Sequence, residues 1–318
     1  LHGSEHSFPT RRSSDLVGIV LVLWGADRLT DGAVAVAEKM KMPQIVIGLT
    51  IVAMGTSMPE FCVSFISALK GTSDLAVGNI VGSNIFNALL IVGVSALVAP
   101  MTIMETTVRK DIPFALVASA MLLMMGLDGD ISRIDAGILF AMFLIFMYMT
   151  LKGAKKQGAD AEATVEAEGK KPMATWLSVV WILVGLLCLI GGSNLFVEGA
   201  TTVATNLGVS EAVIGLTIVA GGTSLPELAT SVVSARKGNS GIAIGNALGS
   251  NVFNILAILG ITGVITPMTL NGITATDLSM LVISIMLVWL FSFTKYKIER
   301  WEGAVLTAVF VGYIYSLL

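Results

Sequence analysis

The chain has 318 residues, of which 55% are hydrophobic and only 13% charged, against roughly 25% charged residues in an average soluble domain. Together with a mean hydropathy of +0.86, this composition excludes an ordinary water-soluble globule and predicts an all-α polytopic membrane protein. The net charge of −3 leaves no basic surface for nucleic acid. We therefore expect the lipid bilayer to be the main partner. No nucleic acid and no obligatory protein partner are expected.

The first residues differ in character from everything that follows. Residues 1–16 are polar and join an apolar run abruptly at Val17, and residues 7–16 resemble a translated sequencing adapter. We therefore expect 1–16 to be a non-native scar and leave it out of the fold. Ten apolar segments follow, and each is predicted to be a transmembrane helix. They cover residues 17–38, 43–69, 75–99, 112–127, 134–151, 175–205, 210–235, 241–266, 277–294 and 301–317.

The chain divides into two similar halves. The longest hydrophilic stretch, residues 152–172, is rich in Ala, Glu, Lys and Gly without apolar periodicity, and is expected to be a flexible linker. It separates two predicted five-helix repeats, residues 17–151 and 173–318. A shift of 167 positions aligns residues 47–100 with 214–267, and 30 of these 54 residues are identical.

Positive charges at the joints predict the orientation in the membrane, because Lys and Arg collect on the cytoplasmic side. One set of alternate loops holds fourteen of them, and the other set holds only Lys70 and Arg133. We therefore expect a multi-pass protein of the cell (inner) membrane with the 152–172 linker in the cytoplasm and both termini outside. Five is an odd number of helices, so the two repeats are predicted to be inverted. This architecture is typical of secondary transporters with a substrate site at the midplane.

Each half carries two polar motifs inside its apolar spans. The first motif reads Gly55-Thr-Ser-Met-Pro-Glu60 and recurs as Gly222-Thr-Ser-Leu-Pro-Glu227. The second reads GNIVGSNIFN over residues 78–87 and recurs as GNALGSNVFN over residues 245–254.

Glu60 and Glu227 are the ionisable residues nearest the centre of any span. A carboxylate at that depth costs several kcal/mol unless it is paired or solvated, and no Lys or Arg in either repeat is placed to pair with it. A bound cation is therefore the expected partner. The proline before each glutamate removes a backbone donor, which is expected to free the carbonyls of Gly55 and Gly222 as further ligands.

Oxygen atoms dominate the surroundings of both glutamates. Thr56 and Ser57 stand four and three positions before Glu60, which predicts two hydroxyls on the face of its own carboxylate. Ser83 and Asn87 share a helix face in the second motif. Such oxygen-only sites select hard cations such as Ca²⁺ and Na⁺, whereas zinc or copper would require His or Cys. The same pattern recurs in the second half at Thr223, Ser224, Ser250 and Asn254, and for Asn79, Asn84, Asn246 and Asn251 both ion contact and interhelical hydrogen bonding stay open.

The doubled motifs resemble the two α-repeats of the sodium/calcium exchanger membrane family, from Val17 onward. The short linker favours its prokaryotic type. The resemblance implies a ten-helix inverted-repeat fold that exchanges external Na⁺ for internal Ca²⁺ by alternating access. It also implies a metal site in which the two glutamates bind both ions, with the carbonyls of Thr56 and Thr223 and the side chains of Asn87 and Asn254 around them. Flanking Na⁺ sites would draw on Ala53, Ser57 and Ser83 in one half and on Ala220, Ser224 and Ser250 in the other.

One position departs from part of that family. Asn254 stands where relatives that also transport K⁺ carry Asp, which argues against K⁺ coupling. The predicted function is thus a secondary active transporter, not an enzyme, with Ca²⁺ and Na⁺ as transported ions and no cofactor. Both ions would compete for Glu60 and Glu227 and cross in separate half-cycles. The alternatives are a Ca²⁺/H⁺ antiporter, in which one glutamate carries the proton, and, with less support, a passive cation channel.

Overall fold

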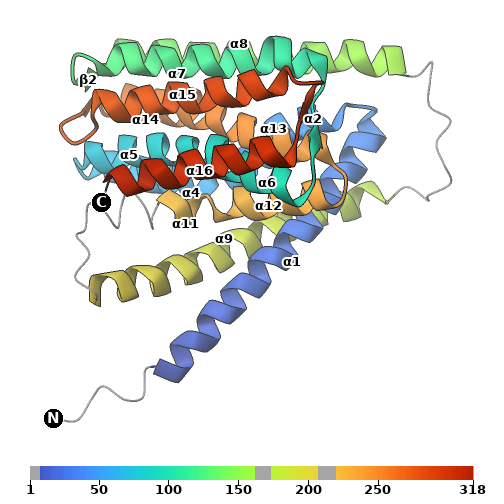
Figure 1. Ribbon diagram of the computed structural model, residues 1–318, viewed down its shortest axis with the longest axis horizontal. Coiled ribbons are helices and arrows are strands. Elements are labelled where there is room, and N and C mark those ends of the chain that lie inside the picture. Colours follow the sequence, from blue (N-terminus) through green and yellow to red (C-terminus); the bar gives the residue numbers. More distant parts are fainter. Residues whose placement is uncertain (1–7, 162–172, 207–219, 318) are drawn as a thin grey trace.

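The computed structural model of the protein describes residues 8–161, 173–206 and 220–317, and most of these residues are helical. Figure 1 shows most helices running along the long horizontal axis, so that their ends gather at two opposite ends of the molecule. The first half consists of α1 (Phe8–Met40), α2 (Gln44–Ile47), η1 (Gly48–Val52), α3 (Ala53–Thr56), α4 (Met58–Leu69), α5 (Ser73–Ile85), η2 (Phe86–Ile91), α6 (Val92–Val98), β1 (Met101–Thr102), η3 (Thr107–Asp111), α7 (Ile112–Gly126), β2 (Asp130–Ile131) and α8 (Arg133–Ala161).

The second half repeats this order of elements closely. The two short π-helical segments η2 and η5 both follow the GSN part of the second motif, 167 positions apart. The elements are α9 (Thr175–Asn206), α11 (Ala220–Thr223), α12 (Leu225–Arg236), α13 (Ser240–Val252), η5 (Phe253–Ile258), α14 (Leu259–Ile265), β3 (Met268–Thr269), α15 (Ala275–Ser292), β4 (Lys297–Ile298) and α16 (Arg300–Leu317).

Two helix boundaries differ from the sequence-based expectation. α1 begins at Phe8, inside the segment 1–16 that we expect to be a scar, and α8 continues to Ala161, inside the segment 152–172 that was expected to be a flexible linker. The extension of α8, residues 152–161, contains three Ala and three Lys, which are strong helix formers. Absence of apolar periodicity therefore indicated the end of the membrane-embedded part rather than the end of the helix. Residues 1–7, 162–172 and 207–219 lie outside the described residues.

Several helices are long and apolar enough to cross a membrane. Over the described ranges there are five such segments, and the pair Gln44–Thr56 and Met58–Leu69, bent by 48°, is a candidate sixth. The protein is thus a multi-pass membrane protein, and the ten spans of the sequence analysis stay a prediction. The five are Ser73–Val98, Arg133–Ala154, Thr175–Leu195, Ser240–Ile265 and Ala275–Ser292.

The segments that carry the second motif form the centre of the molecule. Ser73–Val98 and Ser240–Ile265 are mostly buried, whereas at most one third of the residues are buried in each of the other three candidate spans. Apolar side chains of α5, α7, α13 and α15 pack into one continuous core around them. Each motif thus lies in the part of the fold that is furthest from the protein surface.

α1 and α9 pack against each other as a pair along one side of the molecule, at the bottom of Figure 1. Their contact depends on glycine, because a Cβ atom on Gly25 would lie only 2.8 Å from the carbonyl oxygen of Gly185. A Cβ on Gly185 would in turn lie 2.7 Å from the carbonyl oxygen of Gly25. Small residues allow two membrane helices to approach this closely, so the pair is fixed by backbone contact.

Two short antiparallel ribbons join the halves. β1 pairs with β4 through Met101 opposite Ile298, and β2 pairs with β3 through Ile131 opposite Met268. Met101 and Met268 are 167 positions apart, as are the ranges of β2 and β4, so the ribbons are equivalent under the shift that aligns the two motifs. Each ribbon contains one strand from each half.

Candidate ion-binding site

Both glutamates lie at the start of a helix that follows a break in the chain. Ser57 separates α3 from α4 with φ −81° and ψ 9°, and Ser224 separates α11 from α12 with φ −86° and ψ 5°. Pro59 and Pro226 follow in the first turn of the new helices, where the missing N–H is tolerated. The predicted proline breaks are therefore present. Each glutamate sits in the first turn of its helix, where the positive end of the helix dipole favours a carboxylate.

The hydroxyl groups of the first motif cross to the opposite half. Both glutamates are completely buried. Ser57 Oγ donates to Oε1 of Glu227 at 2.8 Å, and Ser224 Oγ donates to Oε1 of Glu60 at 2.9 Å. The expectation that Ser57 serves the glutamate of its own helix is wrong, because its hydroxyl binds the carboxylate of the opposite half.

The other carboxylate oxygen is left without a partner in both halves. Oε2 of Glu60 and Oε2 of Glu227 are buried and accept no hydrogen bond from the residues that the structure describes. A buried, ionised carboxylate costs several kcal/mol unless a cation or a hydrogen-bond donor compensates it. Each of these two oxygens is therefore suited to bind a cation.

Further buried oxygens of the second motif are also unpaired within the described ranges. Ser83 Oγ, both side-chain polar atoms of Asn87, and Oδ1 of Asn254 have no hydrogen-bond partner. The amide nitrogen of Asn254 donates to Oδ1 of Asn84 at 3.0 Å, which orients the remaining oxygen. Ser250 reaches Oε1 of Glu227 only at 3.4 Å.

The remaining predicted ligands belong to the same helix breaks. Ala53 is completely buried in α3, and Ala220 is the first residue of α11, where its side chain lies outside the described part. Thr56 Oγ1 donates to Oδ1 of Asn246 at 2.9 Å, and Thr223 Oγ1 donates to Oδ1 of Asn79 at 3.3 Å. The two threonine hydroxyls are thus engaged by asparagine side chains.

Sequence reasoning left the roles of four asparagines open, and the structure places all of them in interhelical hydrogen bonds. Asn84 and Asn251 each donate to the other's main-chain carbonyl at 3.3 Å. Asn79 and Asn246 contact both the glutamate-bearing helix of their own half and the threonine of the other half. Asn79 and Asn246 are 167 positions apart and so occupy equivalent places in the two halves. The contacts of one half are therefore repeated in the other.

The hydrogen bond between Ser193 and Gly222 could not be predicted from the repeat, because the first half has no equivalent of it. The hydroxyl of Ser193 in α9 donates to the carbonyl of Gly222, which was expected to be free as a cation ligand. The residue 167 positions earlier is Ala26, which has no hydroxyl. The two halves of the site therefore differ at this point, and the main-chain oxygen released by Pro226 is satisfied by a side chain.

One group of charged residues, in α1 and just after α12, forms ordinary ion pairs. Lys237 lies 2.7 Å from both Asp27 and Asp31, and Arg28 contacts the same two carboxylates. These groups are about one third exposed. Glu60 and Glu227 differ from them in being both fully buried and only half-satisfied.

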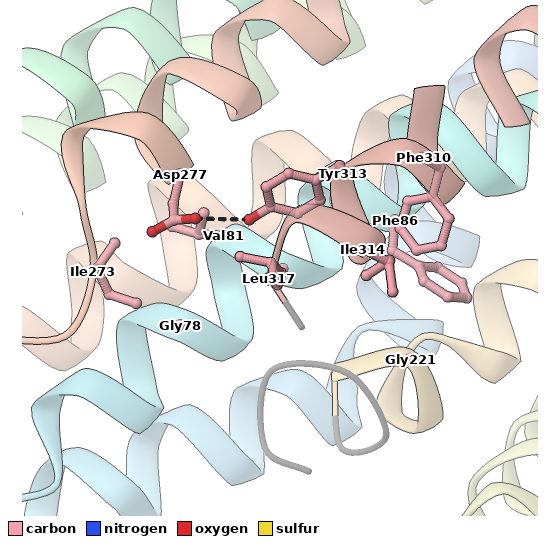
Figure 2. Close-up of a pocket in the computed structure, with 11 residues that line it drawn as sticks. Gly78, Val81, Phe86, Gly221, Ile273, Asp277, Phe310, Tyr313, Ile314 and Leu317 are labelled. Atoms are coloured by element: carbon pink, nitrogen blue, oxygen red, sulfur yellow. Dashed lines mark hydrogen bonds between the residues drawn. The ribbon is translucent and has the colours of Figure 1, made fainter. Parts of the chain in front are cut away.

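A small pocket borders the two motifs between α5, α11, α15 and α16 (Figure 2). Gly78 and Gly221 contribute to its wall, and its volume of about 20 Å³ accommodates one water molecule. Figure 2 shows the Tyr313 hydroxyl pointing at Asp277, to which it donates at 2.9 Å. The other oxygen of Asp277 accepts from the backbone N–H and the hydroxyl of Thr274. The Asp277 carboxylate is thus satisfied as part of the capping box of α15 and is not a third carboxylate of the ion site.

The donor set defines the chemistry of the site. In the part of the chain that the structure describes, no three His, Cys, Asp or Glu side chains come together, so the two glutamates are supplemented by neutral oxygens alone. Carboxylate, hydroxyl and amide oxygens are ligands for hard cations. Helices broken around a buried polar centre are a feature of membrane transporters. Fold and site together define a multi-pass membrane transport protein for cations.

Comparison with known proteins identifies the family. The family described as sodium/calcium exchanger protein matches residues 16–152 and again residues 177–318, and this chain belongs to that family of ion transporters. The "Putative antiporter CaxA" of Alkalimonas amylolytica is 38% identical over 308 residues, covering 95% of this chain and 97% of the relative. The "Sodium/calcium exchanger MaX1" of Methanosarcina acetivorans is 30% identical over 95% of this chain and 97% of its own length.

A solved structure supports the same assignment. The sodium-calcium exchanger NCX_Mj, from a crystal soaked with 2.5 mM Na⁺ and 0.1 mM Ca²⁺, superposes with a TM-score of 0.84 at 30% sequence identity. The match covers 97% of this chain and 99% of NCX_Mj. Other NCX_Mj crystals with similar scores were soaked with Sr²⁺ in place of Ca²⁺.

Proposed function

We propose that the protein exchanges Na⁺ for Ca²⁺ across the cell membrane by alternating access, with both ions competing for one site centred on Glu60 and Glu227. One observation carries the proposal. Each glutamate is fully buried and has one carboxylate oxygen bound by the serine of the opposite half and one oxygen without a partner. Two carboxylates of this kind supply the charge that neutralises one Ca²⁺, and the unpaired oxygens of Ser83, Asn87 and Asn254 supply further ligands.

Competition at this site explains how exchange would arise. Ca²⁺ and Na⁺ both require the two carboxylates, so the site cannot hold both ions at once. Na⁺ must therefore displace Ca²⁺, and the two ions cross in separate half-cycles. The proposed ligands are Glu60, Glu227, the carbonyls of Thr56 and Thr223, and the side chains of Ser57, Ser224, Ser83, Ser250, Asn87 and Asn254, with Ala53 and Ala220 lining flanking Na⁺ sites.

We further propose that ten membrane helices form two five-helix repeats of opposite orientation, residues 17–151 and 173–318. The reciprocal hydrogen bonds at a spacing of 167 residues support this arrangement, as do the two equivalent ribbons. The distribution of Lys and Arg favours external termini and a cytoplasmic segment around residues 152–172. A site at the interface of such repeats would open alternately to the two sides.

The test is a flux measurement with purified protein in liposomes. We expect an outward Na⁺ gradient to drive Ca²⁺ uptake, and we expect Glu60→Gln and Glu227→Gln each to abolish it, because either variant removes a charge that Ca²⁺ requires. Glu302→Gln is a matched control, since this buried glutamate lies at the start of α16 and accepts from the backbone N–H of Glu299.

The same flux measurement with other ion gradients distinguishes Na⁺/Ca²⁺ exchange from the alternative functions. Uptake driven by a pH gradient alone would identify a Ca²⁺/H⁺ antiporter, and Ca²⁺ flux without any counter-ion gradient would identify a passive channel. Dependence on K⁺ would contradict the role given to Asn254. Full activity in both glutamate variants would refute the proposed site.

A further inference from the structure

Asn246 joins a residue of the first half to the main chain of Glu227. Its Oδ1 accepts from Thr56 Oγ1 at 2.9 Å, and its amide nitrogen donates to the Glu227 carbonyl at 3.1 Å and to Ser231 Oγ at 3.0 Å. All four residues are buried. The side chain therefore bridges α3 of one half and α12 of the other.

Asn79 forms the reciprocal bridge. Its Oδ1 accepts from Thr223 Oγ1 at 3.3 Å, and its amide nitrogen donates to Ser64 Oγ at 3.0 Å and to the Glu60 carbonyl at 3.4 Å. Because the bridge exists in both halves, it is a property of the repeat and not an accident of one helix contact.

Two consecutive residues of one half consequently hold the glutamate of the other half at two points. Ser57 binds the Glu227 side chain directly, and Thr56 reaches the Glu227 main chain through Asn246. Ser224 and Thr223 hold Glu60 in the same way, the second contact passing through Asn79. The carboxylate of each glutamate is thus held directly, and the helix turn that carries the glutamate is held at its main chain.

The carboxamide group of asparagine fits this bridge. The position requires one acceptor for the threonine and two N–H donors for the serine and the carbonyl, all on one planar group. Aspartate would lose both donors, and leucine would lose all three contacts at similar volume. In a buried network, loss of one member leaves its partners unsatisfied, so the effect reaches the groups at both ends.

We propose that Asn79 and Asn246 are positioning residues that fix the direction of Glu60 and Glu227 relative to the opposite half of the site. The inference rests on the proposed ion exchange and adds to it a route by which the threonine of one half controls the glutamate of the other. An ion that orders Thr56 and Ser57 thereby orders Glu227, and an ion that orders Thr223 and Ser224 orders Glu60.

The test is a set of double-mutant cycles on full-length protein in liposomes, scored by the Ca²⁺ concentration that gives half-maximal Na⁺-driven uptake. Asn79→Leu, Asn246→Leu, Thr223→Val and Thr56→Val are each expected to raise this concentration about tenfold. Bridged pairs, Asn79→Leu with Thr223→Val and Asn246→Leu with Thr56→Val, are expected to raise it no further than one member alone. The crossed pair Asn79→Leu with Thr56→Val is the matched control and is expected to multiply the two effects.

Conservative variants keep the test decisive if a leucine variant does not fold. Thr56→Ser and Thr223→Ser retain the hydroxyl that the asparagine accepts from, so each is expected to shift half-saturation clearly less than the valine variant at the same position. Bridged pairs that multiply like the crossed pair would overturn the proposal, as would a half-saturating Ca²⁺ concentration that stays unchanged in all four single variants. Wild-type protein without Na⁺-driven uptake would instead refute the exchange function itself.

Discussion

Ser57 donates a 2.8 Å hydrogen bond to Glu227, 170 positions further along the chain, although it lies only three positions before Glu60. The relationship makes Ser57 part of the carboxylate site of the other half. We expect Ser57→Ala to raise the Na⁺ concentration for half-maximal exchange about tenfold, because Oε1 of Glu227 loses its nearest donor. Ser95→Ala is the control, since this buried serine of α6 lies outside both motifs. Equal behaviour of the two variants would contradict a role for the Ser57 hydroxyl at the site.

Close packing of α1 against α9 gives a second prediction. Gly25→Ala would place its Cβ 2.8 Å from the Gly185 carbonyl oxygen, so we expect a loss of roughly 1–3 kcal/mol in the free energy of unfolding in detergent. Gly191→Ala in α9 is the matched control, because nothing lies within 4 Å of its Cβ position. This control should leave the protein unchanged or stabilise it by up to about 1 kcal/mol through helix propensity. A Gly25→Ala variant as stable as Gly191→Ala would show that the two helices separate without cost.

Asp111 predicts a pH dependence of stability. It lies just before α7, outside the segments expected to span the membrane, beside a cavity of about 340 Å³ that Lys110 and Lys152 also line. Burial raises the pKa of Asp111 from 3.8 to about 6, although the nearby Lys110 acts in the opposite direction. Because the pKa is higher in the folded protein, the unfolded chain releases its proton first, so stability falls as the pH rises from about 4 to about 6.

The difference between those two pKa values corresponds to about 3 kcal/mol. Asp111→Asn is therefore expected to raise the free energy of unfolding by about 2–3 kcal/mol at pH 7.5 and to have no effect near pH 4. The exposed residue Asp128 provides the control variant Asp128→Asn, which removes a carboxylate that is not buried. Chemical denaturation in detergent at both pH values is the measurement, and a gain from Asp111→Asn that does not change with pH would count against this explanation.

The predicted orientation can be tested at the two ends of α7. In a background with Cys62→Ala and Cys188→Ala, which removes the two free thiols, Asp128→Cys and Arg109→Cys place single exposed thiols after and before this helix. We expect a membrane-impermeant maleimide to label position 128 in intact cells and position 109 only after the cells are opened. The reverse pattern would invert the topology that the positive charges predict.

The sequence was informative wherever the repeat or a proline determined the structure. The breaks before Glu60 and Glu227 follow from Pro59 and Pro226, whose missing N–H excludes a continuous helix. Burial of both glutamates followed from their depth in apolar spans. The family was also evident, because paired GTSxPE and GNxxGSNxFN motifs combine backbone breaks with oxygen donors in an order that chance does not repeat.

Contacts between the two halves could not be predicted from the sequence. Helix periodicity assigned Thr56 and Ser57 to the face of Glu60, since it describes neighbours within one helix and not across an interface. The hydrogen bond from Ser193 to Gly222 had no counterpart in the first half and gave no signal. The extension of α8 to Ala161 was not predicted, because hydropathy indicates only which residues lie in the membrane. A helix can extend beyond the membrane where its residues have high helix propensity.

Because Ser57 and Ser224 each bind the glutamate of the opposite half, neither half contains a complete carboxylate site by itself. A chain ending after α8 would contain Glu60 but not the hydroxyl that binds it, and a chain beginning at α9 would contain Glu227 in the same condition. In each fragment the glutamate therefore lacks the serine hydroxyl that donates to it in the full-length protein. When the two fragments are co-expressed as separate polypeptides, we expect them to associate, because each supplies the hydroxyl that donates to the carboxylate of the other.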